Sequence, residues 1–124
     1  MKIRIKGNSV RIRISKSELN EFAQSGVLQE ETDFGLQKFS YKLISRAQEY
    51  PLDAAYTGQA IEIYVNQHEA QNWANTELVG IKHYKPLAND NSLFLLLEKD
   101  FKCIDNEAME DQSDNFDNPL HTCQ

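Results

Sequence analysis

The chain has 124 residues, of which 40% are hydrophobic, and a formal net charge of -6. This length supports one sizeable hydrophobic core and is too short for two typical domains, so we expect a single domain over residues 1–124. No stretch reaches the roughly 18 consecutive apolar residues of a membrane span, and the basic start alternates isoleucine with lysine and arginine instead of forming the apolar segment of a signal peptide. We therefore expect a cytoplasmic protein without a membrane partner.

Residues 2–14 predict a β-hairpin that leads into a helix. Isoleucine alternates with basic residues on both sides of Gly7, as expected for two half-buried strands joined by a tight turn. Ser15 and Glu18 then fit a capping box, in which each side chain binds the other residue's backbone N–H. A short helix should begin there and end at Gly26. Two further strands complete this half of the chain, over residues 27–32 and 38–43.

The second half of the chain repeats the first at an offset of 51 residues. Gly7 falls on Gly58 and Phe22 on Trp73, and Asn66 takes the place of the capping serine, Ser15. The same order of strand and helix signals in both halves indicates an internal duplication.

We therefore predict an α+β fold built from a duplicated ββαββ unit, with halves at residues 1–46 and 52–98. Two short helices should pack on an antiparallel sheet, which is either open or closed like a barrel. An acidic C-terminal tail, residues 102–124, follows the second half.

The last predicted strand is apolar on both faces. Leu93, Leu95 and Leu97 take the core positions, so Phe94 and Leu96 point to the opposite face. A strand of this kind is usually central and covered on both sides. The cover would be the tail, the other half of a closed barrel, or a second subunit. The last case predicts a homodimer through the strand that carries Phe94 and Leu96.

Charge is distributed unevenly along the chain. The first 16 residues carry six cations and no acid, whereas the residues from 98 onward carry eight acids and two lysines. One face of the first hairpin should carry five of these cations, which could bind an anion or a phosphate group: Lys2, Arg4, Lys6, Arg11 and Arg13. The absence of interleaved aromatic residues on that face, together with the acidity of the whole chain, argues against nucleic acid. We expect the acidic tail to pack on this basic hairpin.

Three residues near the C-terminus are candidate metal ligands: Cys103, His121 and Cys123. Thiolate and imidazole groups suit zinc or iron, but a zinc site normally takes four ligands and this chain lacks a closely spaced cysteine pair. Cysteines in the cytoplasm usually remain thiols. Free thiols, metal ligands and a disulfide all stay open, and two thiols lying close together without a metal are our expectation.

Three segments, MKIRIKGNS, SLFLLLEKDFKC and EDQSDNFDNP, resemble a family of small uncharacterised bacterial proteins that is classed as a domain of unknown function. The resemblance runs along the whole chain and implies a bacterial cytoplasmic protein. It supplies no activity, cofactor or site. It includes Cys103 and Cys123 but not His121, which weakens a site made of cysteine and histidine.

The sequence contains no nucleophile elbow, no paired-histidine helix and no phosphate-binding glycine loop. We therefore expect a small non-enzymatic binding or accessory protein whose acidic tail packs on its basic hairpin. One alternative is a metal-dependent or thiol-dependent protein that uses Cys103 and Cys123. A second alternative is anion or phosphate binding on the hairpin face.

Overall fold

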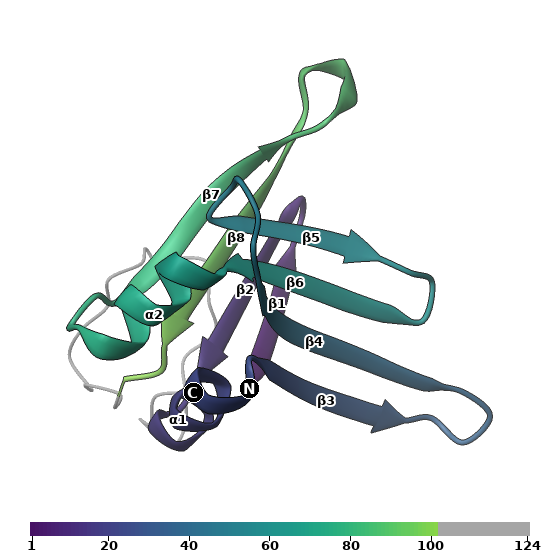
Figure 1. Cartoon of the computed structure of the whole chain (residues 1–124). Helices are drawn as coiled ribbons and strands as arrows, with labels where there is room; N and C mark the ends of the chain where they lie inside the picture. Colours follow the sequence, from purple (N-terminus) through teal and green to yellow (C-terminus); the bar gives the residue numbers. More distant parts are fainter. Residues whose placement is uncertain (102–124) are drawn as a thin grey trace, which may run out of the picture.

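The structure is a computed structural model that describes residues 1–101. Within these residues the order of elements is ββαββ, repeated once (Figure 1). The first half consists of β1 (Lys2–Lys6), β2 (Ser9–Ile14), α1 (Lys16–Ser25), β3 (Val27–Asp33) and β4 (Lys38–Arg46). The second half consists of β5 (Leu52–Tyr56), β6 (Ala60–Asn66), α2 (Gln67–Asn75), β7 (Gly80–Pro86) and β8 (Ser92–Lys99), with a short 3-10 helix, η1 (Ala88–Asp90), between β7 and β8.

The two halves exchange hairpins to build two four-stranded sheets. Sheet A has the strand order β1-β2-β8-β7, and sheet B has the order β3-β4-β6-β5. Each sheet therefore combines one hairpin from each half, and exchanging the halves converts the strand order of one sheet into that of the other. The predicted α+β fold with a duplicated ββαββ unit is confirmed.

The central strand pairs differ from the expected antiparallel sheet. β2 pairs with β8 in parallel, and β4 pairs with β6 in parallel, whereas the outer pairs are antiparallel. The physical reason is the exchange of hairpins, because central strands from different halves are not joined by a short turn and so need not run antiparallel. No closed barrel forms within residues 1–101: each sheet keeps two edge strands, and the sheets diverge away from the helices (Figure 1).

Helix α1 begins and ends as predicted. Ser15 accepts a hydrogen bond from the Glu18 N–H at 3.4 Å, and the Ser15 N–H donates to the Glu18 carboxylate at 2.9 Å. Gly26 closes the helix in the left-handed conformation, with φ of 77°, which glycine adopts without a steric penalty. The predicted capping box is therefore present.

Helix α2 has half of the predicted capping box. The Asn66 side chain accepts from the N–H groups of His68 and Glu69, at 2.9 and 3.2 Å. The Asn66 N–H, however, donates to the Pro51 carbonyl at 3.0 Å instead of to Glu69. The linker between the halves thus takes the place of the glutamate. No helix within residues 1–101 is long and apolar enough to cross a membrane.

The hydrophobic core is shared by both helices and both sheets. Phe22 of α1 and Trp73 of α2 occupy equivalent positions in the repeat and are exposed by only 2% and 0%. The Trp73 Nε1–H donates to the Val79 carbonyl at 3.1 Å. The strands add the branched residues Ile12, Ile14, Leu43, Leu52, Ile63, Val65, Leu95 and Leu97 to the same cluster. Because each sheet contains strands from both halves, the two halves share one core.

Candidate anion-binding face

The outer face of sheet A, which we call the basic face, carries side chains in three rows that run across the strands. The alternate positions, such as Ile12, Leu95 and Leu97, are buried in the core. The strand register places Lys6, Ser9, Phe94 and Tyr84 in the first row, Arg4, Arg11, Leu96 and Lys82 in the second, and Lys2, Arg13, Glu98 and Gly80 in the third. The five cations expected on one face of the hairpin do share that face, and Lys82 of β7 is a sixth cation on it.

Positive charge is concentrated in the first two rows. In the third row, Glu98 accepts from Arg13 at 2.7 Å and lies 3.5 Å from Arg11. Asp100, just after β8, pairs with Lys2 at 3.0 Å. The remaining cations, Arg4, Lys6 and Lys82, are exposed and have no acidic partner within the described part of the chain, so their charge is available to a ligand.

A shallow cavity of about 210 Å³ opens on the basic face. Its lining combines three cations, one hydroxyl group and one aromatic ring, from Arg4, Lys6, Arg11, Ser9 and Phe94, together with Val10. Guanidinium and ammonium groups bind phosphate oxygens, and an aromatic ring offers a stacking surface for a planar group. The cavity can therefore hold an anionic group beside a flat ring.

Two aromatic rings of the basic face were missed by the sequence analysis. The centroids of Tyr84 and Phe94 lie 4.8 Å apart, with their planes tilted by 43°. Phe94 is half-buried, whereas Tyr84 is 62% exposed. The two-sided apolar pattern of β8 placed Phe94 outside the core, but only the parallel pairing of β2 with β8 places it beside Ser9.

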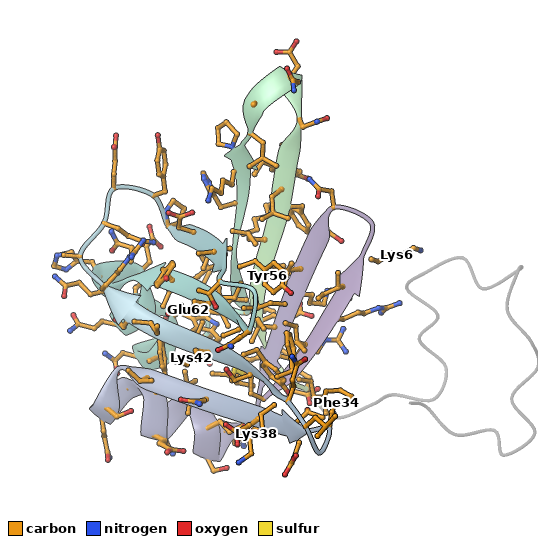
Figure 2. The ribbon with its side chains drawn as sticks, turned by 90° about the vertical axis from the view of Figure 1, so that its right-hand side faces the viewer. Lys6, Phe34, Lys38, Lys42, Tyr56 and Glu62 are labelled. Carbon is orange, nitrogen blue, oxygen red and sulfur yellow. The ribbon has the colours of Figure 1, made fainter. Side chains whose placement is uncertain are left out.

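The basic face points away from sheet B. In Figure 2, Lys6 extends from the β1–β2 hairpin on the side opposite to Lys42 and Glu62, which lie on sheet B. Lys6 is therefore not covered by the second sheet.

Sheet B provides an internal comparison, because the repeat places other residues in the same backbone positions. The equivalents of Lys2, Arg4, Lys6, Arg11 and Arg13, at the offset of 51, are Asp53, Ala55, Thr57, Glu62 and Tyr64. None of the five is a cation, and the same ββαββ arrangement forms around them. The fold therefore does not require basic residues at these positions.

An ion-pair cluster joins the two sheets at another corner of the molecule. Asp53 of β5 accepts from Lys85 of β7 at 2.7 Å and lies 3.5 Å from Arg46, whose guanidinium stacks 3.6 Å from the centroid of the Tyr64 ring. Partial burial would raise the pKa of Asp53, but the hydrogen bonds from Lys85 and the Ala54 N–H and the charge of Arg46 outweigh it, so this pKa lies below its ordinary value. The cluster stabilises the contact between β5 and β7.

An apolar cleft of about 530 Å³ lies between the sheets, where they diverge. Its lining contains no charged residue and is formed mainly by Ile5, Val10, Phe39, Tyr56, Ile61 and Leu93. It offers mainly apolar contacts, with hydroxyl groups from Ser9 and Tyr56 and no acidic or basic side chain in its lining.

The remaining predicted sites fall outside what the structure describes. Cys103, His121 and Cys123 lie beyond residue 101, so a metal site, a disulfide and free thiols stay predictions. Within residues 1–101, no cluster of three or more histidine, cysteine, aspartate or glutamate side chains could hold a metal ion. Phe94 and Leu96 are half-buried on the basic face, and their cover by the tail or by a second subunit also stays a prediction.

Comparison with known protein families matches residues 1–120 to a family of unknown function (DUF7009). No curated protein and no solved structure matches the chain. The resemblance to a domain of unknown function is confirmed, whereas the bacterial origin and cytoplasmic location that it implied stay predictions.

Proposed function

The chain belongs to a family of unknown function (DUF7009), and we propose that it is a small non-enzymatic binding protein whose basic face binds anionic ligands. The observation that carries the proposal is the uncompensated charge of Arg4 and Lys6 beside the cavity that they line with Arg11. Buried or paired cations would serve folding, but exposed cations without partners on one face are typical of an anion-binding surface.

The acidic tail is the occupant that we propose for this face when no ligand is bound. The described chain ends beside the basic face, where the Asp100 N–H donates to the Ile14 carbonyl at 2.9 Å and its carboxylate pairs with Lys2. Residues 102–124 then carry six acids and one lysine. A segment tethered next to its target has an effective concentration of the order of millimolar.

Tail and ligand should compete, because a charged contact of this kind is weak. Exposed ion pairs contribute about 0–1 kcal/mol each and are screened by salt. An anionic ligand that presents several charges can therefore displace the tail. The protein would then work as a binding or accessory protein that its own tail partly blocks.

Calorimetric titration of the full-length protein with inorganic tripolyphosphate tests the proposal. A tail-neutralised variant, in which the six tail acids are replaced by asparagine or glutamine, should bind tripolyphosphate more tightly than the wild type. Adding Arg4→Ser and Lys6→Ser to this variant should abolish most of the binding. The matched control is the tail-neutralised variant with two other cations removed, Lys16→Ser and Lys38→Ser. It should bind tripolyphosphate nearly as tightly as the tail-neutralised variant.

Two results would contradict the proposal. If the tail-neutralised protein does not bind tripolyphosphate at low salt, the basic face is not an anion-binding surface. If the control pair weakens binding as much as the Arg4 and Lys6 pair, the effect comes from net charge and not from the basic face.

A further inference from the structure

We infer that the ligand of the basic face is a single strand of nucleic acid, with its phosphates on the cations of the first two rows and a base against the Phe94 and Tyr84 rings. This inference rests on the proposed function and adds the chemical class of the ligand. It reverses the expectation drawn from the sequence, because the aromatic residues whose absence argued against nucleic acid are present on that face.

The aromatic pair is the feature that simple anion binding leaves unexplained. Tyr84 is 62% exposed, and its ring lies against that of Phe94. Phe94 in turn lines the cavity beside Arg4 and Lys6. Proteins that bind single strands combine cations that follow the backbone with aromatic rings on which bases stack. Inorganic anions and acidic peptides would use the cations alone.

The acidity of the chain does not oppose this ligand. Residues 102–124 carry six acids and one lysine, which is -5 of the net charge of -6, so residues 1–101 carry only -1. The basic face, with six cations against Glu98 and Asp100, is strongly positive within that nearly neutral body. The low isoelectric point thus comes from the tail.

The shape of the face favours an unpaired strand over a duplex or a free nucleotide. Bases in a duplex are stacked on one another and cannot stack on a protein ring, whereas unpaired bases can. The cavity of about 210 Å³ is smaller than the roughly 300–1,000 Å³ of small-molecule sites. Four strands also make a face roughly 14 Å wide, since neighbouring strands lie about 4.8 Å apart, and its cations are spread over two rows. An extended polymer fits this spread better than a single nucleotide.

Fluorescence anisotropy with a labelled oligothymidylate of about 12 nucleotides tests the inference, using the full-length tail-neutralised protein. Tyr84→Leu and Phe94→Leu should each weaken oligonucleotide binding, between about five-fold and a hundred-fold. Tyr84→Leu, whose ring lies outside the cavity lining, should leave tripolyphosphate binding unchanged. Phe94→Trp keeps an aromatic ring at this position and should bind the oligonucleotide as tightly as the parent. Phe34→Leu removes an aromatic residue that is exposed like Tyr84 but lies in the β3–β4 turn (Figure 2), and this matched control should change the binding of neither ligand.

The outcomes separate the inference from the proposed function. If both aromatic variants bind the oligonucleotide as tightly as the parent while tripolyphosphate still binds, the nucleic-acid inference is wrong and the proposed function stands. The same conclusion follows if a hairpin duplex of the same sequence length, or a polyglutamate peptide, binds more tightly than the single strand. If neither the oligonucleotide nor tripolyphosphate binds, the proposed function itself is wrong. Thermal melting of Tyr84→Leu at the parent's temperature checks that the variant is folded.

Discussion

The rings of Tyr84 and Phe94 lie with their centroids 4.8 Å apart on the basic face of sheet A. The antiparallel pairing of β7 with β8 places these two residues opposite each other, and the parallel pairing of β2 with β8 places Phe94 opposite Ser9. The aromatic pair comes from the second half of the chain and most of the cations from the first half. The basic face therefore exists only because the halves exchange hairpins.

The shared core predicts that a mutation in one half destabilises the other. Phe22→Ala, in the first half, should reduce the free energy of unfolding by about 3–5 kcal/mol, the usual cost of deleting a buried aromatic side chain. Trp73, the single tryptophan of the chain, lies in the second half. The free energy of unfolding measured from Trp73 fluorescence in urea should fall by this same amount, because one core serves both halves.

Separate unfolding transitions would contradict the shared core. If Phe22→Ala lowers the midpoint seen by circular dichroism but leaves that of Trp73 fluorescence unchanged, the halves unfold independently. Tyr56→Ala is the control, since this ring is 71% exposed and its loss should change stability by no more than about 0.5 kcal/mol.

The two helix caps should differ in their contribution to stability. Ser15→Ala removes one capping side chain, at a typical cost of about 1 kcal/mol. Asn66→Ala should cost about 2 kcal/mol, because the Asn66 Nδ2 also donates to the Gln48 carbonyl at 2.6 Å. Asn66→Ser keeps a cap acceptor and lacks the Nδ2 donor, so its cost should fall between zero and that of alanine. Equal costs for Ser15→Ala and Asn66→Ala, measured by urea denaturation, would show that the hydrogen bond from Asn66 Nδ2 to the Gln48 carbonyl does not stabilise the protein.

Asp53 should make stability depend on pH in the acid range. Its folded pKa lies below the ordinary value of 3.8, so the stabilisation is fully present above that value and is lost as the pH falls through the folded pKa. Asp53→Asn should cost about 1 kcal/mol at neutral pH, as expected for a partly exposed ion pair with an added N–H bond. The difference in the free energy of unfolding between Asp53→Asn and the wild type should disappear at pH values below the folded pKa.

Urea denaturation at several pH values measures this dependence. Gln37→Ala, which changes an exposed side chain that does not titrate, is the control and should give a constant difference. A difference between Asp53→Asn and the wild type that persists unchanged below the ordinary pKa would rule out an ionised Asp53 as its cause.

Self-association through β8 is the alternative to the tail and the nucleic-acid strand as the cover of the basic face. A second subunit would cover Phe94 and Leu96, since an apolar strand surface that is only half-buried favours pairing. Sedimentation equilibrium should then show a dimer that Leu96→Lys converts to a monomer. A monomer at every concentration tested would leave the tail or a ligand as the cover of this face.

The sequence predicted the features that depend on local chemistry. The turn at Gly7 and the cap at Ser15 follow from spacing within a few residues, because hairpins and helices form between neighbours. The equivalence of Phe22 with Trp73 follows from the repeat of these local signals at an offset of 51 residues. The five cations were placed on one face by alternation alone, since side chains alternate along a strand.

Long-range pairing could not be predicted in the same way. The register that aligns Arg11 with Leu96 joins strands more than 80 residues apart, and nothing in either strand specifies its partner or direction. The expected antiparallel sheet was therefore wrong for the two central pairs, and the aromatic side of the candidate site was missed. Cys103, His121 and Cys123 lie outside the described residues, so their role stays a prediction.

Nuclear magnetic resonance titration of the full-length tail-neutralised protein with oligothymidylate tests the binding face most directly. We predict that amide signals shift along the first two rows of sheet A, at Lys6, Arg11, Phe94 and Lys82. The signals should stay in place at the positions of sheet B that the strand register makes equivalent: Thr57, Glu62, Ser40 and Gln29. Shifts spread equally over both sheets, or confined to sheet B, would contradict the assignment of the basic face as the binding surface.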